Sequence, residues 1–351
     1  MMRDIWQDVT EWTKAGKLFA IARVVQTWRS APRSAGAGML VDEAMCVSGS
    51  VSGGCIEGAV IEEALEVLQS GTPRKLTYGV EDELALSVGL SCGGQVSVFV
   101  EPHWAFAEDS GTQVVWDALQ QCLRDNEPAV LLTRMSGQGP RHLLVRPENS
   151  TAGDWGMAQK EAERLAREAY DQREPEVVEL AGGEVFVQVF PRRDQLLIIG
   201  AGHITIPLVQ YAAALDFETV VVDPRKVFAS TERFPVAPDH LIPEWPQEAL
   251  ARRSLNEDTY ALLLTHDPKI DDPALLLLLK SPVRYIGALG SRRTHAKRCG
   301  RLREAGFDEA AISRIKGPAG LDIGAESPAE MALSMIAEAI AAKRGKLAQD
   351  A

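Results

Sequence analysis

The stretch Gln195-Leu-Leu-Ile-Ile-Gly-Ala-Gly-His-Ile-Thr-Ile-Pro-Leu208 decides the fold of the second half of the chain. A short apolar run over residues 195–199 ends at Gly200-Ala-Gly202, and an apolar stretch with helical character follows from His203 to Leu215. Glycine lets the backbone turn tightly between a strand and a helix. The stretch therefore predicts a strand, a glycine turn and a helix, in that order.

The same alternation continues outward from this stretch. Continuous apolar runs predict further buried strands at residues 219–222, 260–264 and 283–286. Strands that read as continuous apolar runs and alternate with helices are typical of a parallel sheet covered on both faces. We therefore expect an α/β fold with a C-terminal, Rossmann-like, doubly wound parallel sheet.

Two helix starts can be predicted within this part of the chain. Asp271 or Asp272 is expected to cap a helix whose first turn takes Pro273. The final helix is expected to begin at Ser327, because the side chains of Ser327 and Glu330 can form a capping box.

The N-terminal part is less regular and predicts a mixed α/β domain. Strands are expected near residues 20–28, 38–41, 95–100, 129–134, 142–146 and 184–189. Helices are expected near residues 56–69 and 113–124, with a surface helix within 149–174. We place the domains at 1–190, with a strand-rich second portion over 110–190, and at 191–351, joined by the linker Phe190–Asp194.

Composition and charge indicate a globular protein that neither binds nucleic acid nor spans a membrane. The 351 residues are 46% hydrophobic and 25% charged, as in ordinary globular proteins. The net charge of −12 belongs to the first part, where 16 Lys and Arg stand against 28 Asp and Glu before Pro191; from Pro191 onward the count is 21 against 21. We expect no nucleic-acid partner at this charge. No apolar stretch approaches the roughly 20 residues of a membrane-spanning helix, and no secretory leader is visible.

The cysteines indicate a reduced chain. Their number is odd and no C-x-x-C pair occurs, so we expect a cytoplasmic protein without a structural zinc site. Cys46, Cys122 and Cys299 have no special sequence context and are expected to be packing residues.

The glycine turn has partners suited to a phosphorylated ligand. Free N–H groups at the start of a helix bind phosphate, and Asp223, directly after the next strand, could hold ribose hydroxyls. The third glycine position of G-x-G-x-x-G is occupied by Thr205, which weakens the case for NAD(P). A Rossmann scaffold that holds another phosphorylated ligand stays open.

A second glycine turn precedes a strongly basic helix. Gly287-Ala-Leu-Gly290-Ser291 follows a predicted strand, Ser291 can cap the helix, and Arg292 and Arg293 come next. Arginine side chains and helix N-terminal N–H groups favour anions. We interpret this turn as an anion site, although a solvated basic helix face would show the same sequence.

The segment GSVSGGCIEGAV, residues 49–60, places Cys55 between glycines and a helix. A thiol there can act as a nucleophile or a soft-metal ligand, although Glu57 partly cancels the field of the helix dipole. Cys92, in Ser91-Cys-Gly-Gly94, has the same kind of setting. Two glycine-flanked cysteines in one domain suggest a shared site.

Together these motifs resemble the XdhC/CoxI family, accessory proteins of molybdenum hydroxylases such as xanthine dehydrogenase. The resemblance covers nearly the whole chain and is carried by GSVSGGCIEGAV, Ser91–Gly94, LLIIGAGHITIPL, VVVDPR, THDPKIDDPAL, YIGALGSRRTHAKR and GLDIGAESPAEMALSMIAE. It implies an N-terminal XdhC/CoxI domain followed by a Rossmann-like domain. It also implies a chaperone, and not an enzyme, that binds the molybdenum cofactor (molybdopterin), supports its sulfuration and inserts it into an apo-hydroxylase.

The resemblance also indicates partners and site residues. A cysteine desulfurase and a second copy of the chain are expected partners besides the apo-hydroxylase. We expect Cys55, and Cys92 with it, to contact or sulfur-load molybdenum, while Gly200, Gly202, Ser291 and Arg292 form the phosphate side. The full set of expected cofactor-binding residues is Cys55, Glu57, Cys92, Gly200, Gly202, His203, Asp223, Arg225, His266, Asp267, Gly287, Gly290, Ser291 and Arg292.

Two other functions are compatible with the same residues. An NAD(P)-dependent oxidoreductase would use Asp223 for ribose and His203, His266 or a cysteine for acid and base chemistry. A nucleotide-sensing regulator would bind the nucleotide without turnover.

Overall fold

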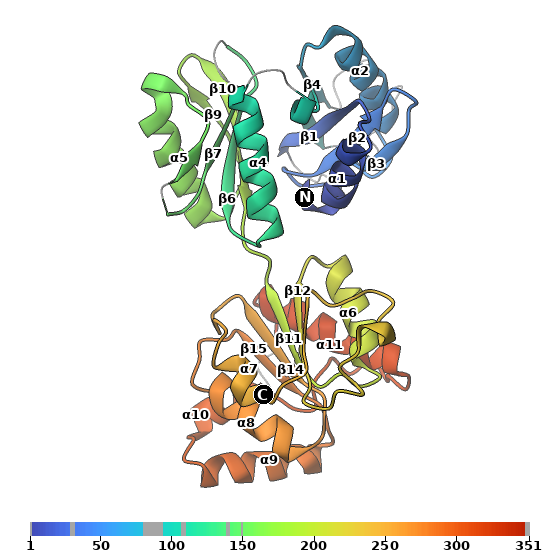
Figure 1. The fold of residues 1–351 in the computed structure, drawn as a ribbon, viewed down its shortest axis with the longest axis vertical. Coiled ribbons are helices and arrows are strands. Elements are labelled where there is room, and N and C mark those ends of the chain that lie inside the picture. Colours follow the sequence, from blue (N-terminus) through green and yellow to red (C-terminus); the bar gives the residue numbers. More distant parts are fainter. Residues whose placement is uncertain are drawn as a thin grey trace. The chain divides into compact units, whose positions relative to one another are not determined.

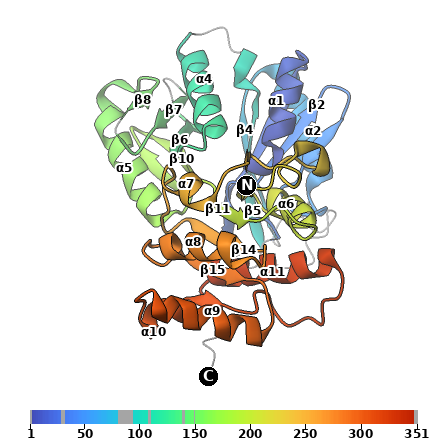
Figure 2. The same cartoon turned by 60° about the horizontal axis from the view of Figure 1, so that its bottom comes forward.

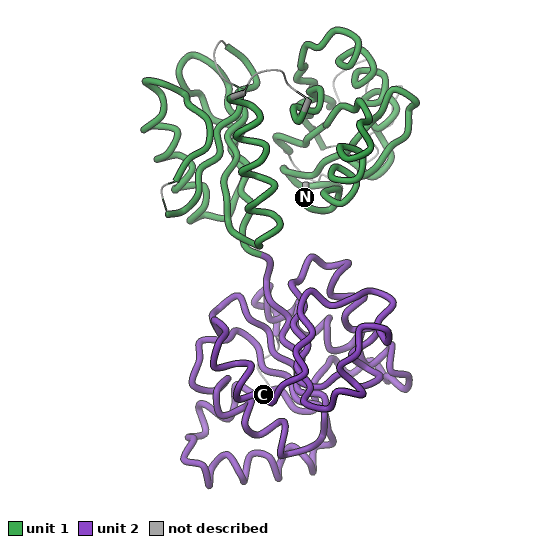
Figure 3. Tube along the Cα trace, in the orientation of Figure 1, with its two compact units in different colours: residues 1–192 green, residues 193–351 purple. Residues whose placement is uncertain are grey.

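The computed structural model describes residues 2–28, 32–79, 94–106, 110–137, 141–148 and 150–347. The chain divides into two compact units, residues 1–192 and 193–351, which Figure 3 shows in different colours. Among the described residues, no helix is both long and apolar enough to cross a bilayer.

The first sheet of unit 1 is antiparallel and has the order β3-β2-β1-β5-β4. Figure 1 labels β1 to β4 of this sheet. Its strands are β1 (Phe19–Trp28), β2 (Gly38–Asp42), β3 (Val47–Gly49), β4 (Arg74–Tyr78) and β5 (Gln95–Pro102). The single turn η1 (Met2–Ile5) and helices α1 (Trp6–Lys14) and α2 (Glu57–Ser70) accompany them. Helix α2 covers one face because Val60, Ala64 and Val67 recur at helical spacing and are fully buried against the strands.

The second sheet of unit 1 is also antiparallel and has the order β8-β7-β6-β10-β9. Its strands are β6 (Ala129–Arg134), β7 (His142–Val145), β8 (Thr151–Ala152), β9 (Glu176–Leu180) and β10 (Gly183–Phe190). The helical segments are η2 (Trp104–Phe106), α4 (Ser110–Arg124), η3 (Gly156–Ala158) and α5 (Gln159–Gln172). Along β6, Leu131 packs with residues of α4 and Leu132 with residues of α5, so the two helices cover opposite faces.

A buried polar network joins the two sheets of unit 1. Arg23 on β1 donates to Glu101 on β5 (2.5 Å), to Thr133 on β6 (3.1 Å) and to Gln188 on β10 (3.3 Å). His142 on β7 lies 3.3 Å from the other oxygen of Glu101. Although burial on its own raises the pKa of Glu101, His142 and Arg23 lower it to about 2, so the carboxylate stays charged.

Unit 2 is built on a parallel sheet of order β13-β12-β11-β14-β15-β16. The strands are β11 (Gln195–Ile199), β12 (Glu218–Val222), β13 (His240–Ile242), β14 (Thr259–Leu263), β15 (Tyr285–Ala288) and β16 (Ile315–Lys316). The helical segments are α6 (Thr205–Ala214), η4 (Thr231–Arg233), α7 (Pro246–Leu250), α8 (Pro268–Leu278), α9 (Arg292–Glu304), α10 (Glu309–Ile312) and α11 (Pro328–Lys343).

Alternate residues of these strands feed two separate cores. Leu196 and Ile198 of β11 pack with α6 and α11, whereas Leu197 and Ile199 pack with α7, α8, α9 and α10. Helices α8 and α9, which contact each other, can be followed in Figure 2. The prediction of a doubly wound, Rossmann-like parallel sheet is confirmed.

Some local predictions need correction. Helix α8 begins one turn earlier than expected: Asp267, not Asp271 or Asp272, caps it by accepting from the N–H of Lys269, and Pro273 lies inside the helix. The short strands β3, β4, β8, β9, β13 and β16 were not expected, and the strand expected at 283–286 begins at Tyr285. The capping box of Ser327 and Glu330 is confirmed.

Candidate functional site

The loop after β11 is held by a glycine that no other residue could replace without strain. Gly200 has φ of +109°, and a Cβ on it would lie 2.7 Å from Cγ2 of Thr265, in the loop after β14. Strands β11 and β14 are neighbours at the point where the strand order changes direction. Ligands of doubly wound sheets bind at this point, outside the carboxyl ends of the strands.

The next residues of this loop present open N–H groups. Among the described residues, none accepts a hydrogen bond from the N–H of Gly202, His203 or Ile204. A Cβ on Gly202 would have no atom within 4 Å, and the His203 side chain is exposed. Thr205, at the third glycine position, is fully buried and donates its hydroxyl to the carbonyl of Gly200 at 2.6 Å. The loop is therefore closed by a side chain and leaves three N–H groups for an anion.

Asp223, directly after β12, has both carboxylate oxygens hydrogen-bonded to other residues of the protein. One carboxylate oxygen accepts from the N–H of Ala201 (2.8 Å) and Nη2 of Arg225 (2.7 Å), and the other accepts from N and Nε of Arg225 (2.9 Å each). Burial on its own raises the pKa of Asp223, but the hydrogen bonds from Arg225 and Ala201 hold it below its ordinary value. The charged carboxylate is fully buried and ties the glycine loop to β12. Its role toward ribose stays a prediction.

An arginine pair stands beside the same loop. The guanidinium groups of Arg225 and Arg233 lie 4.4 and 5.1 Å from the ring centroid of Phe228. Nη1 of Arg233 donates to the carbonyl of Ala201 at 2.7 Å. Because Arg225 is paired with Asp223, Arg233 is the residue of this pair that places positive charge next to the open N–H groups. Sequence reasoning missed Arg233, which is 32 positions from its loop partner.

The loop after β14 carries an exposed histidine in an uncommon conformation. His266 has φ of +59°, in the left-handed region that residues other than glycine rarely adopt. Asp267 next to it is committed to capping α8. Thr265 donates to buried Asp271 at 2.6 Å.

The loop after β15 forms the predicted cap of the basic helix. Ser291 accepts from the N–H of Thr294 at 3.2 Å, and Gly290 has φ of +134°. Arg292 and Arg293 are exposed. Gly287 lies within β15 and is buried; a Cβ on it would collide with Tyr285 and Leu262, so its small size serves packing.

In unit 1 the segment around Cys55 is organised by Glu57. The Glu57 carboxylate accepts from the hydroxyls of Ser50 (2.6 Å) and Ser52 (2.5 Å). It also accepts from the N–H groups of Val51, Ser52, Gly53 and Gly54, at 2.8 to 3.2 Å. The Ser52 hydroxyl in turn accepts from the N–H groups of Cys55 and Ile56. Every N–H from residue 51 to residue 56 is thus occupied by the chain itself.

This arrangement fixes the charge of Glu57 and the place of the thiol. Burial on its own raises the pKa of Glu57, but hydrogen bonds from Ser50, Ser52 and the loop lower it to about 2. Cys55 is half-buried against the core beneath α2. Gly53 and Gly54, with φ of +82° and +120°, give the backbone the curvature that surrounds the carboxylate.

The other cysteines differ in setting. Cys92 lies outside the described residues, so a shared site with Cys55 stays a prediction. Cys122 and Cys299 are buried, as expected of packing residues, but Cys46 is exposed and that prediction is wrong. The described residues contain no group of three or more His, Cys, Asp or Glu side chains placed to hold a metal ion.

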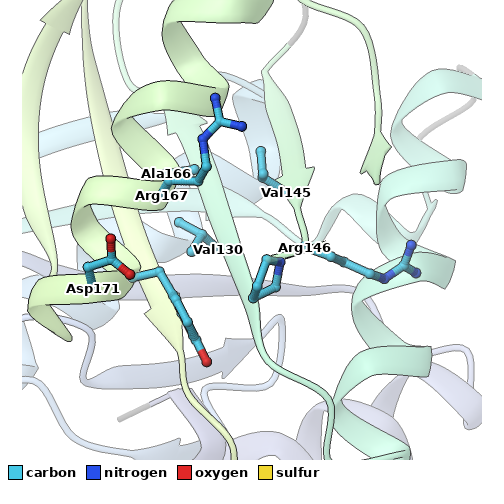
Figure 4. A pocket seen from close by; sticks show the side chains of 8 residues that line it. Val130, Val145, Arg146, Ala166, Arg167 and Asp171 are labelled. Atoms are coloured by element: carbon cyan, nitrogen blue, oxygen red, sulfur yellow. The ribbon is translucent and has the colours of Figure 1, made fainter. Parts of the chain in front are cut away.

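A pocket in unit 1 had no signal in the sequence. It has a volume of 170 Å³ and lies between α5 and strands β6 and β7 (Figure 4). Its lining is Val130, Val145, Arg146, Pro147, Ala166, Arg167, Tyr170 and Asp171. Figure 4 shows the guanidinium of Arg146 turned away from the valines, and this group donates to Cys122 and Ser150. Ordinary core and surface residues from three elements form the pocket, so no motif marks it.

The fold brings most of the predicted residues of unit 2 to one edge of its sheet. Gly200, Gly202, His203, Asp223, Arg225, His266, Asp267, Gly290, Ser291 and Arg292 all follow the carboxyl ends of parallel strands. Gly287 is the exception within unit 2. In unit 1, Cys55 and Glu57 share one loop.

Two descriptions of one protein family match different parts of this chain. The family description "XdhC Rossmann domain" matches residues 196–339, and "XdhC and CoxI family" matches residues 12–79. A protein of Bacillus subtilis (strain 168) that is named as a probable xanthine dehydrogenase subunit is 28% identical over 331 residues, which cover 92% of this chain and 93% of that protein. The molybdenum cofactor insertion chaperone PaoD of Escherichia coli (strain K12) is 27% identical over 345 residues, covering 96% and 87%.

A solved structure is similar over the same length. The crystal structure described as a xanthine dehydrogenase from Bacillus halodurans matches with a TM-score of 0.78 and 27% identity, over 99% of this chain and 98% of that one.

Proposed function

Because the chain belongs to the XdhC/CoxI family, we propose that it is a chaperone that carries the molybdenum cofactor to a molybdenum hydroxylase. The observation that carries the proposal is the similarity, over 96% of the chain, to a protein named as a molybdenum cofactor insertion chaperone. Two features of the fold support the proposal: open N–H groups in unit 2 that suit a phosphate, and the Cys55 thiol in unit 1 that suits a soft metal. The client is a hydroxylase of the xanthine dehydrogenase type in this proposal.

The phosphate side of the cargo would be held by unit 2. The open N–H groups of Gly202, His203 and Ile204 and the capped start of α9 are suited to a phosphate. Gly200 would shape the first loop, and Ser291 and Arg292 would serve the second. Gly202 supports this use, because nothing in the described structure fills the space that its Cβ would take.

For the metal we consider Cys55 of unit 1 by itself. Since Glu57 and Ser52 occupy the N–H groups of that loop, the thiol is what the loop presents to a ligand. A thiolate is a ligand that soft metals prefer. We propose that Cys55 contacts the molybdenum centre or passes sulfur to it, with a cysteine desulfurase as the sulfur donor and the chain acting as a homodimer.

One observation favours a second candidate function. The order of the unit 2 sheet is that of dinucleotide-binding sheets, so a nucleotide could occupy the loop after β11. The engagement of Asp223 by Arg225 argues against ordinary ribose recognition by this carboxylate. Titration with NADH and NADPH tests this alternative, and turnover would distinguish an oxidoreductase from a sensor.

The chaperone proposal is tested by Cys55→Ala, with Cys46→Ala as the matched control because Cys46 is an exposed cysteine of the same unit. Both variants are purified from cells that make the cofactor and are assayed for bound pterin and molybdenum and for activation of the apo-hydroxylase. We expect Cys55→Ala to fold normally and to lose most of the activation, and Cys46→Ala to retain it. Full activation by Cys55→Ala would exclude the thiol, and wild-type protein without bound pterin would count against the chaperone.

A further inference from the structure

Arg298 is a buried cation that has no direct ion-pair partner among the described residues. It lies on α9 and is 2% exposed. Its Nη2 donates to the carbonyl of Leu289 at 2.9 Å, whereas its Nε and Nη1 have no partner among the described residues. A buried guanidinium with unsatisfied N–H groups is unfavourable, so proteins normally pair it.

The carboxylates of Asp271 and Asp272, which act on Arg298 electrostatically, form their hydrogen bonds with other side chains. Asp271 accepts from Thr265; burial raises its pKa, whereas the hydrogen bond from Thr265 and the charge of Arg298 act in the opposite direction. Asp272 forms a two-bond pair with Arg301, at 2.5 and 2.9 Å. Within the described part of the chain, no carboxylate lies within ion-pair distance of Arg298. Burial accordingly lowers the pKa of Arg298, although Asp271 and Asp272 act in the opposite direction.

The side of this guanidinium that faces the start of α9 is positive. The bond to Leu289 sets it directly beneath the turn that begins α9, where the helix dipole is positive. The N–H groups of Arg292 and Arg293 have no acceptor among the described residues, since Ser291 binds only those of Thr294 and His295. The side chains of Arg292 and Arg293 are exposed at the same turn.

We infer that Arg298 binds an anion together with the first turn of α9, and that this anion is a phosphate monoester. A tetrahedral dianion would accept from the N–H groups of Arg292 and Arg293 and from the fork of Arg298, and would balance the buried charge. The inference depends on the proposed function in one respect only: the molecule that bears the phosphate would be the carried cofactor. The inference assigns the phosphate of the cofactor to the loop after β15. It also adds Arg298 to the site, a residue that the sequence does not distinguish from the other basic residues of α9.

The test is isothermal titration of the full chain with inorganic phosphate, paired with thermal unfolding in phosphate and in chloride at equal ionic strength. Replacing Arg298 by Met keeps an unbranched apolar stem and removes the buried charge. We expect Arg298→Met to bind phosphate at least about tenfold more weakly than the wild type and to lose its phosphate-dependent rise in Tm. In chloride its Tm should equal or exceed that of the wild type, because an unbalanced buried charge has been removed.

The matched control is Arg301→Met on the same helix. Loss of the pair with Asp272 should lower Tm in chloride but leave phosphate affinity unchanged. Phosphate affinity of Arg298→Met within twofold of the wild type, or no phosphate binding by the wild type, overturns the inference. Should Arg298→Met fail to fold, Arg298→Gln is measured with the same criteria. Pterin content and client activation are assayed separately, so the chaperone proposal can fail while phosphate binding stands, and the reverse.

Discussion

Two of the glycine loops of this protein differ in how their backbone N–H groups are occupied. Around Cys55, the N–H groups exposed by the curved backbone are filled by the protein's own carboxylate, Glu57. After β11, Asp223 takes only the N–H of Ala201 and leaves those of Gly202 to Ile204 open. Similar glycine-rich sequences thus give one loop that is complete in itself and one that is ready for an external anion.

The largest expected effect on stability distinguishes the two glycines of the open loop after β11, Gly200 and Gly202. Gly200→Ala should lower the free energy of unfolding of unit 2 by about 3 kcal/mol, because φ is positive and the added Cβ meets Thr265. Gly202→Ala should change it by less than about 0.5 kcal/mol, because no atom lies within 4 Å of the Cβ that it adds. Urea unfolding measures both effects, and equal stability of the two variants would contradict the assignment.

The next effect concerns the closed loop and depends on pH. The pKa of Glu57 is lowered to about 2, so its stabilising contribution is present above its ordinary value of 4.5 and is lost as pH falls through about 2. Glu57→Gln should therefore destabilise unit 1 by about 2 kcal/mol at neutral pH, after allowance for solvent screening, and should approach the wild type near pH 2. Unfolding measured from pH 7 to pH 2 tests this. A constant difference across the range would mean that the charge of Glu57 does not hold the loop.

The smallest effect concerns the closure of the open loop. Thr205→Val removes the hydroxyl that bonds to the Gly200 carbonyl and keeps the side-chain shape, so unit 2 should lose about 1 kcal/mol. Denaturant unfolding measures the loss. A Thr205→Val variant as stable as the wild type would show that the hydroxyl does not secure the turn.

The parallel sheet of unit 2 could be predicted because its signals are local. Strands buried on both faces read as continuous apolar runs, and Gly200 and Asp223 mark where two of them end. The edge strands β13 and β16 have three and two residues, too few to show any periodicity. The start of α8 was misplaced because Asp267-Pro268 gives the same cap signal as Asp272-Pro273, one turn earlier.

The candidate site was predicted less completely because it depends on packing. The six cations between Arg292 and Arg303 look alike in sequence, and only the fold buries Arg298 while it leaves Arg292 exposed. The sequence suggested that Glu57 weakens the helix field at Cys55. It could not show that two glycines with positive φ would fold the loop around the carboxylate.

Glu57 also has a practical consequence for studies of the thiol. The N–H groups of this loop already bind the Glu57 carboxylate, so the loop does not need an anion from the solvent. Phosphate or sulfate in a buffer should therefore neither change the shape of the loop nor shield Cys55. Alkylation of this cysteine can therefore be compared between preparations in different salts, and a change in its rate would report a ligand at the thiol rather than a change of electrolyte.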